Sequence, residues 1–193
     1  MVSSDTIFAL STPRGKSAIS VFRVTGSKSH NIIKKISSLK KTEPNKSLLG
    51  YIFDNRKKII DRCVFIFFKS PKSFTGENMV EISCHGSLAI IKKLSYELQK
   101  TGMRIAEPGE FTRRALENDK IDLTQVEAMG DLINANTEKQ RELAFNNLKG
   151  SLKNFSSKTA LDIKKMIADI EAIIDFSDED LPKNMLLKIK EHN

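Results

Sequence analysis

The sequence has no tryptophan, only two cysteines among its 193 residues, and no long hydrophobic run. No apolar stretch approaches the roughly 20 residues that a helix needs to cross a bilayer, so no membrane span is predicted. The start of the chain, Met1 to Asp5, lacks the basic-then-apolar order of a signal peptide, and we therefore expect a cytoplasmic protein. Cys63 and Cys84 lie in apolar stretches without metal-ligand spacing, which favours two buried, reduced thiols and no metal site.

Acidic residues are in the minority. The chain has 32 lysines and arginines against 24 aspartates and glutamates, a formal net charge of +8 and a pI near 9.4. Such a balance favours anionic partners, RNA above all, through steering and counterion release. Lysine dominates the excess in exposed-looking pairs such as Lys34-Lys35 and Lys40-Lys41. Charge alone therefore does not separate a nucleic-acid patch from an ordinary solvated surface.

The first half of the chain alternates short β-prone segments with amphipathic helical segments. One helix is expected to follow Ser27, which can cap it, and another to run from about Ser87 to Lys100. The predicted strands are Thr6–Leu10, Ala18–Val24, Leu48–Phe53, Arg62–Phe68 and Met79–His85. This order predicts an α+β fold with a mixed five-stranded sheet and helices.

The strand signals stop after Gly109, and the rest of the chain has helical patterning. Asp122 with Gln125, and Thr137 with Gln140, have the spacing of a capping box at a helix start. We therefore divide the chain into one domain over residues 1–118 and part of an α-helical domain over residues 119–193.

The apolar residues after Thr137 recur at steps of three and four. They predict one helix from Thr137 to Ile174, about 57 Å long at 1.5 Å per residue. So long an apolar stripe needs partners, and two alternatives follow: the helix pairs with another chain, or the rest of its bundle lies outside this sequence. The stretch Pro182–Asn193 continues as a lysine-rich amphipathic segment.

The segment Gly15-Lys16-Ser17 resembles the end of a phosphate-binding loop. That loop needs a glycine five positions earlier, so that backbone amides can wrap around the phosphates. Leu10 occupies this position, within a predicted strand, and Pro13 removes one of the amide donors. The segment is therefore not expected to bind a nucleotide.

The predicted strand Met79–His85 separates two kinds of side chain by its period-2 alternation. One face carries Val80, Ile82 and Cys84, and the other carries Glu81, Ser83 and His85. The apolar set can pack in a core while an acid, a hydroxyl and an imidazole are presented together. The pattern fits an ordinary half-exposed strand or a polar ligand pocket, in which a carboxylate accepts two parallel hydrogen bonds from an aminopyrimidinone edge.

Two basic residues are further candidates for this pocket. Arg23 shares a strand face with Ile19 and Val21, a row that we expect to point inward with the guanidinium at its end. Lys120 lies in the link before the helix that Asp122 is expected to start. Each residue taken alone is equally compatible with a solvated surface position.

Several motifs taken together resemble the MnmE (TrmE) family. They begin with Asp5-Thr6-Ile7, Thr12-Pro13, Arg23 and Gly26, and continue with Ser73-Phe74-Thr75-Gly76-Glu77, Glu81 and His85-Gly86. Later blocks are Pro108-Gly109-Glu110-Phe111-Thr112, Arg114-Ala115, Asn118–Gln125, Asp131-Leu132-Ile133 and Gly150. The resemblance covers residues 5 to about 182, nearly the whole chain.

The resemblance implies a specific fold and ligand. The N-terminal domain of the family is similar to the tetrahydrofolate-binding domain of the glycine-cleavage aminomethyltransferase. It dimerises and binds 5-formyl- or 5,10-methylene-tetrahydrofolate through an arginine, a glutamate and a lysine. By motif these positions fall on Arg23, Glu81 and Lys120, and no catalytic residue is assigned to this chain.

The resemblance also implies partners and a process. The family acts with the flavoprotein MnmG to build a 5-aminomethyl or 5-carboxymethylaminomethyl group on the wobble uridine of certain tRNAs. The family's GTP, Mg and K sites belong to a GTPase domain that this sequence does not contain, so hydrolysis is not expected here. The usual His-Gly-Gly is His85-Gly86-Ser87 in this chain, which departs from the family at the turn after the strand.

Two other functions stay open. A folate-dependent aminomethyl- or methyltransferase could use the same pocket, and would need an acid or base near the one-carbon unit. A non-catalytic RNA-binding or scaffold module would agree with the charge of +8 and would bind tRNA with a steep salt dependence.

Overall fold

The computed structural model describes residues 5–175 of the chain. It divides into two compact units, Met1–Asp122 and Leu123–Asn193, which we describe separately. The expected amphipathic stretch Pro182–Asn193 lies outside the described residues. Within residues 5–175, no helix combines the length and the apolar character needed to cross a membrane.

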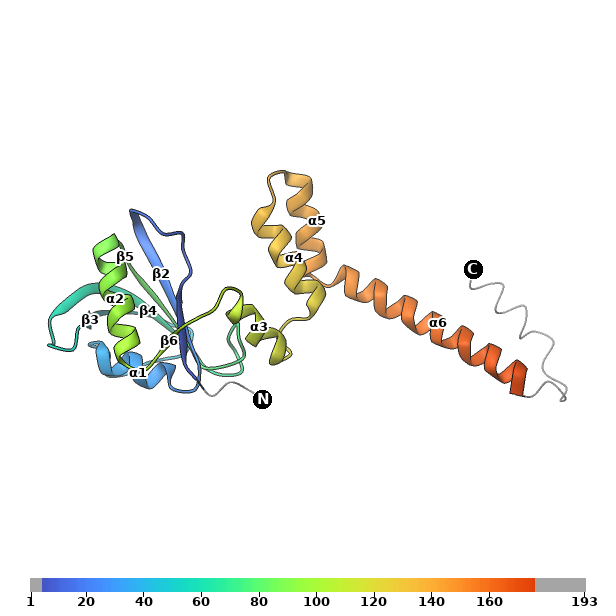
Figure 1. The fold of residues 1–193 in the computed structure, drawn as a ribbon, viewed down its shortest axis with the longest axis horizontal. Coiled ribbons are helices and arrows are strands. Elements are labelled where there is room, and N and C mark those ends of the chain that lie inside the picture. The colour runs from blue at the N-terminus through green and yellow to red at the C-terminus, as the bar shows by residue number, and fades with distance from the viewer. Residues whose placement is uncertain (1–4, 176–193) are drawn as a thin grey trace. The chain divides into compact units, whose positions relative to one another are not determined.

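The N-terminal unit is built on a mixed six-stranded sheet of order β3-β4-β5-β2-β1-β6 (Figure 1). All neighbouring strands are antiparallel except β1 and β6, which are parallel. The strands are β1 (Ile7–Leu10), β2 (Ser17–Thr25), β3 (Ser47–Phe53), β4 (Ile59–Phe68), β5 (Met79–Gly86) and β6 (Arg104–Ile105).

The predicted α+β class is confirmed, but the count of five strands is wrong. The sixth strand, β6, has only two residues and extends the edge of the sheet beside β1. Backbone bonds join it to β1: the Arg104 amide donates to the Thr6 carbonyl and the Ala106 amide to the Phe8 carbonyl. Two residues cannot show a period-2 pattern, which is why the sequence did not reveal this strand.

One face of the sheet forms the core. Phe22, Phe65, Phe67 and Ile82 are buried there, and α1 (Ser29–Ile36) and α2 (Leu88–Lys100) add Ile33, Leu94 and Leu98 to the same cluster. Cys63 and Cys84 belong to this core as free thiols, as predicted. Burial raises the pKa of the Cys84 thiol to about 11, and it raises the pKa of Cys63 further, so both thiols are unreactive near neutral pH.

The expected cap of the first helix is wrong. Helix α1 begins at Ser29, its N-cap residue is Lys28, and no side chain caps it. Gly26 lies just before it with φ +129°, because the chain passes so close to Asp5 and Thr6 that a Cβ at this position would meet their atoms at 2.8 Å. The helix therefore begins beyond the position that a Ser27 cap would give it.

The opposite face of this sheet is covered only in part within residues 5–122: Thr25 and Met79 are buried on it, where the loop between β4 and β5 packs. This face presents apolar side chains from three strands, with Ile19 on β2, Leu49 and Tyr51 on β3, and Val64 on β4. Ile19 is 61% exposed and Leu49 is 56% exposed. We call this surface the open sheet face.

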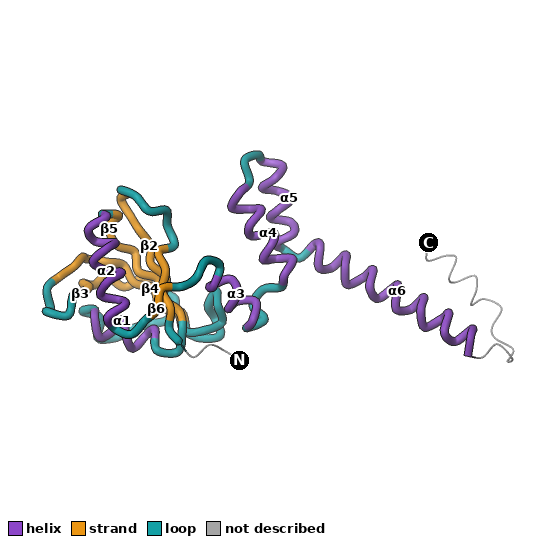
Figure 2. The backbone as a smooth tube through the Cα atoms, in the orientation of Figure 1, coloured by secondary structure: helices purple, strands orange, loops and turns teal. Residues whose placement is uncertain are grey.

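The C-terminal unit contains helices α4 (Leu123–Asn134), α5 (Glu138–Leu148) and α6 (Ser151–Asp175). Figure 2 shows α4 and α5 as a helical hairpin, and the Gln125 amide on the first turn of α4 donates to the carbonyl of Leu148 at the end of α5. The predicted capping box at Thr137 and Gln140 is confirmed.

The single long helix expected from Thr137 to Ile174 is wrong. It is interrupted between α5 and α6 at Lys149 and Gly150. Gly150 has φ +97°, in the left-handed region, and its amide donates to the Asn147 carbonyl, which closes the end of α5. The apolar stripe continues across the break, so hydrophobic periodicity alone does not reveal it.

Candidate functional site

Arg23 and Glu81 face each other across two neighbouring strands. They are direct partners in the antiparallel register of β2 and β5, and the Arg23 Nε donates to the Glu81 Oε1 at 2.8 Å. Both side chains project from the open sheet face. The structure therefore brings together two of the three residues that the sequence analysis assigns to the ligand site.

The orientation expected for the Arg23 row is wrong. Ser20, Phe22 and Val24 of β2 are buried in the core, so Ile19, Val21 and Arg23 point to the opposite, open sheet face. Alternation gives the two sets of side chains but not which set faces the core, because both sets on β2 contain apolar residues. The Arg23 guanidinium therefore lies on an accessible surface and not at the edge of the core.

A cavity of about 420 Å³ lies against this pair. Arg23 and Glu81 form part of its lining, and the remaining lining residues are Asn45, Phe68, Lys72, Ser73, Phe74 and Met79. The Arg23 guanidinium carbon lies 5.8 Å from the centroid of the Phe74 ring, within cation–π range. The cavity thus combines a carboxylate, two cationic side chains and aromatic walls.

The polar atoms of the pair have unused bonding capacity. In the described part of the chain, Arg23 and Glu81 have no polar side-chain partner besides each other. Each carboxylate oxygen has two acceptor positions, so Glu81 can keep its bond from Arg23 and still accept two parallel N–H groups. Such an arrangement suits a planar heterocycle with an amidine-like edge.

Lys120 lies at the loop that walls this cavity, but it is not among the cavity-lining residues. Its amide donates to the Ala115 carbonyl at the end of α3 (Glu110–Glu117), at 2.9 Å. Its side-chain stem packs over Gly76: a Cβ on Gly76 would lie 3.2 Å from the Lys120 Cγ. Within the described residues, no hydrogen bond or ion pair joins Lys120 to Arg23 or Glu81.

His85 does not join Glu81 in one pocket, contrary to the expectation that Glu81, Ser83 and His85 are presented together. Its Nδ1 pairs with the Asp61 Oδ1 at 2.8 Å, and its amide donates to the Asp61 Oδ2 at 2.8 Å. It lines a separate cavity of about 410 Å³ with Lys16 and Ser17. Ser17 opens strand β2 rather than a helix, which confirms that Gly15-Lys16-Ser17 is not a phosphate-binding loop.

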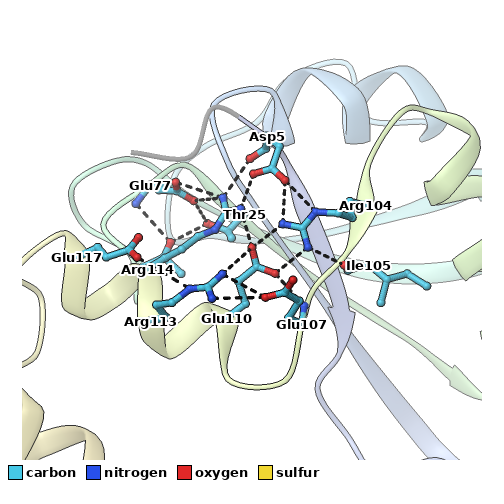
Figure 3. A network of polar contacts seen from close by, with 11 residues as sticks. Asp5, Thr25, Glu77, Arg104, Ile105, Glu107, Glu110, Arg113, Arg114 and Glu117 are labelled. Atoms are coloured by element: carbon cyan, nitrogen blue, oxygen red, sulfur yellow. Dashed lines mark hydrogen bonds and ion pairs between the residues drawn. The ribbon is translucent and has the colours of Figure 1, made fainter. Parts of the chain in front are cut away.

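Behind the cavity wall is a network of charged residues that the sequence did not reveal (Figure 3). Arg114 of α3 is 3% exposed and contacts three carboxylates, those of Asp5, Glu77 and Glu110. Arg104 joins it through Asp5 and Glu110. The i,i+4 spacing of Glu110 and Arg114 was the only local signal, since Asp5 is 109 positions from Arg114.

The network keeps its members charged. Hydrogen bonds from Arg104, with further bonds from the Glu107 amide and from Arg114, lower the pKa of the Glu110 carboxyl to about 2 although its side chain is only 1% exposed. Burial opposes the charged form of Arg114, but its bonds with Glu110 and Asp5 and the charge of Glu77 outweigh burial and raise its pKa. The ion pairs therefore persist over the whole physiological pH range.

No group of three or more histidine, cysteine, aspartate or glutamate side chains within residues 5–175 could hold a metal ion. The candidate site consists of the Arg23–Glu81 pair and the loop between β4 and β5, with Lys120 beside that loop.

Two family models match the chain. The model for the GTP-binding protein TrmE N-terminus matches residues 6–120, and the model for the MnmE helical domain matches residues 123–192. Among curated proteins, the tRNA modification GTPase MnmE of Thermotoga maritima is 44% identical over 176 residues, which are 91% of this chain and 39% of that protein.

Two further relatives have the same name. The tRNA modification GTPase MnmE of Aliarcobacter butzleri is 41% identical over 190 residues, 98% of this chain and 43% of that protein. That of Anaplasma marginale is 44% identical over 186 residues, 95% of this chain and 41% of that protein. The chain thus spans about two fifths of the length of these relatives. With both family models matching in order, the chain belongs to the MnmE (TrmE) family, of which it covers the N-terminal part.

Proposed function

We propose that the N-terminal unit binds a one-carbon tetrahydrofolate, 5-formyl- or 5,10-methylene-tetrahydrofolate, and that Arg23, Glu81 and Lys120 contact it. The observation that carries the proposal is the Arg23–Glu81 pair, which has no other polar side-chain partner within residues 5–175 and lies against a cavity of about 420 Å³. That volume is in the usual range of about 300–1,000 Å³ for small-molecule sites.

The chemistry of the cavity fits the two ends of a folate. Glu81 can accept a pair of hydrogen bonds from the aminopyrimidinone edge of the pterin, while Arg23 fixes the carboxylate in orientation. Phe74 and Phe68 supply flat apolar walls for the bicyclic ring. Lys72 lines the cavity and Lys120 lies beside its wall, and both carry ammonium groups that suit the carboxylates of a glutamate tail.

Titration calorimetry with 5-formyltetrahydrofolate tests this assignment. We expect Glu81→Gln and Arg23→Ala each to raise the dissociation constant by about tenfold or more, because each removes a charge-assisted bond. Matched controls are Glu43→Gln and Arg56→Ala, exposed residues outside the cavity lining, which should bind like the unmodified chain. Absence of binding, or equal binding by the site and control variants, would contradict the proposal.

We also propose that this unit forms a homodimer through the open sheet face. The apolar side chains of Ile19, Leu49 and Tyr51 on that face are exposed, and a second copy would bury them by a self-complementary contact. Sedimentation of Leu49→Asp should then show a shift to monomer. Leu88→Asp changes a comparably exposed leucine on α2, and should leave the dimer intact.

The relatives are named tRNA modification GTPases, and these names support a proposal for the cellular role. We propose that this chain supplies the folate-binding part of a cytoplasmic tRNA modification system that acts with MnmG on wobble uridine and produces the 5-aminomethyl or 5-carboxymethylaminomethyl group. GTP hydrolysis, with its Mg and K, is assigned to the portion of the family protein that this chain does not cover. The positive charge favours a salt-dependent contact with tRNA.

A further inference from the structure

The loop over residues 69–78, between β4 and β5, lines the cavity on one side and is buried against the rest of the unit on the other. Lys72, Ser73 and Phe74 form one wall of the cavity beside Arg23 and Glu81. Thr75 and Glu77 belong to the same loop but lie on its other side, where Thr75 is fully buried and the Glu77 side chain is 11% exposed. Whatever holds Thr75 and Glu77 therefore also sets the position of the cavity wall.

The rear of the loop is bound to the sheet through Thr25, the last residue of β2. The Thr25 hydroxyl lies 2.7 Å from the Thr75 hydroxyl and donates to the Glu77 Oε2 at 2.8 Å. Thr25 is fully buried and lies two residues beyond Arg23 on the same strand. This contact fixes the loop relative to the strand that carries Arg23.

The loop is also bound to helix α3. Glu77 pairs with the buried guanidinium of Arg114, its Oε2 lying 3.3 Å from the Nη1, and the Asn118 side-chain amide donates to the Thr75 carbonyl at 2.7 Å. Lys120 lies three residues after Glu117, the last residue of α3, and its amide donates to the Ala115 carbonyl. The loop is thus bound both to the strand that carries Arg23 and to the helix that precedes Lys120.

We propose that Glu77 and Arg114 are positioning residues for the ligand site: their buried ion pair fixes the loop over residues 69–78 against both β2 and α3, and so holds Lys120 in register with the Arg23–Glu81 pair. Neither residue lines the cavity. The proposal rests on the folate site proposed above, and it extends that site to two residues whose effect on affinity is indirect.

The contact between Glu77 and Arg114 can be removed while the other ion pairs of Arg114 stay in place. Arg114 also contacts Asp5 and Glu110, so Glu77→Gln leaves it with two carboxylates and does not strand a buried charge. Arg104 provides a matched control. It contacts the same Asp5 and Glu110, but among the described residues no hydrogen bond or ion pair joins it to the loop over residues 69–78 (Figure 3).

The experiment measures two quantities on the whole chain: the dissociation constant for 5-formyltetrahydrofolate by calorimetry, and amide hydrogen exchange over residues 69–78 without ligand. Glu77→Gln should raise the dissociation constant by about tenfold and speed exchange in the loop, since a charge-assisted anchor is lost. Arg104→Gln removes two ion pairs and should lower the thermal midpoint at least as much. Its dissociation constant should stay within about twofold and its loop exchange should not change.

A second variant guards against misfolding of the first. Thr25→Val keeps the shape of a buried side chain but removes the hydroxyl that joins Thr75 and Glu77, and it should reproduce both effects of Glu77→Gln. Unchanged affinity and exchange in both loop variants would overturn the proposal. So would an equal loss of affinity in Arg104→Gln, because that result would indicate a general loosening of the domain.

The folate site and the positioning role fail in different ways. If Arg23→Ala and Glu81→Gln lose binding while Glu77→Gln binds normally, the folate site stands and the positioning role is wrong. If the unmodified chain does not bind 5-formyltetrahydrofolate, the folate site is wrong, and the positioning role falls with it. Exchange over residues 69–78 then still decides whether Glu77 anchors the loop.

Discussion

The two units of this chain differ in how their apolar side chains are used. The N-terminal unit buries a continuous cluster that includes Phe22, Phe65 and Leu94 between one sheet face and two helices. In the helical unit Ala128 and Ala144 are the only buried apolar side chains among residues 123–175, and α6 has no buried residue. The N-terminal unit therefore has a core formed by its own residues. Helices α4, α5 and α6 leave most of their apolar side chains accessible to solvent.

The charged residues show the same difference. In the N-terminal unit Arg114 and Glu110 are nearly inaccessible and are joined to residues more than a hundred positions away. In the helical unit the ion pair of Glu138 and Arg141 is local and exposed on both sides. Local contacts such as capping boxes and i,i+3 ion pairs determine where a helix ends. Long-range ion pairs such as those of Arg114 can fix side chains as precisely as a ligand site requires.

The largest effect that separates the units should come from truncating a phenylalanine in each. Phe65→Ala leaves a cavity in the core and should lower the free energy of unfolding by about 3–5 kcal/mol. Phe155→Ala on α6 removes a side chain that is 69% exposed and should cost about 0.5 kcal/mol or less. Urea unfolding followed by tyrosine fluorescence reports the N-terminal unit, since Tyr51 and Tyr96, the two tyrosines, both belong to it.

Similar losses of stability in Phe65→Ala and Phe155→Ala would contradict this difference between the two units. A large loss for Phe155→Ala, seen by far-ultraviolet circular dichroism, would mean that α6 is packed in solution against a surface outside residues 123–175. Repeating the measurement at several protein concentrations separates packing within the chain from packing between chains, because only the latter depends on concentration.

Acid should weaken the N-terminal unit through Glu110. Its folded-state pKa, about 2, lies below the ordinary value of 4.5, so its ionised form contributes stability that is fully present above about pH 4.5. This contribution, about 3 kcal/mol, is lost as the pH falls from about 4.5 to about 2. The free energy of unfolding of the unmodified chain should therefore decrease more steeply over this window than that of Glu110→Gln. Parallel pH dependences for the two proteins would contradict the assignment.

The sequence allowed most of the sheet and its buried face to be predicted. The alternation in Met79–His85 correctly placed Val80, Ile82 and Cys84 in the core, and the apolar face of the helix after Ser87 is buried at Ile91, Leu94 and Leu98. Repeating patterns of this kind depend only on local geometry. They are informative wherever a segment is long enough and has one buried side.

The unpredicted parts depend on single residues or on distant partners. The inward orientation expected for Arg23 was wrong because β2 has apolar residues on both faces. The Arg114 network joins segments that only the fold brings together, so no spacing in the sequence reveals it. The contact between Arg23 and Glu81 agrees with the prediction that both belong to one ligand site. Their role in folate binding stays a prediction.

A substitution at Gly150 tests whether this single residue determines the break between α5 and α6. Its φ of +97° is unfavourable for a residue with a Cβ, so Gly150→Ala should cost about 1–2 kcal/mol at the junction of α5 and α6. Alanine also favours helix, and the apolar stripe continues across the junction. Amide exchange should therefore show either a destabilised end of α5 or new protection at residues 149–150. Unchanged exchange there would mean that the glycine does not determine the break.

The smallest of these effects should come from the capping box at the start of α5. The Thr137 hydroxyl accepts from the Gln140 amide and the Gln140 side chain accepts from the Thr137 amide, at an exposed position far from any core. Thr137→Ala should cost about 1 kcal/mol of local helix stability. Thr137→Ser keeps the hydroxyl and is the matched control. Because the helical unit has little buried surface to compensate, the loss should be visible as faster exchange throughout α5, while Tyr51 and Tyr96 fluorescence stays unchanged. A loss confined to the first turn would instead show that α4 holds α5 in place, and that this unit has more tertiary stability than its buried residues indicate.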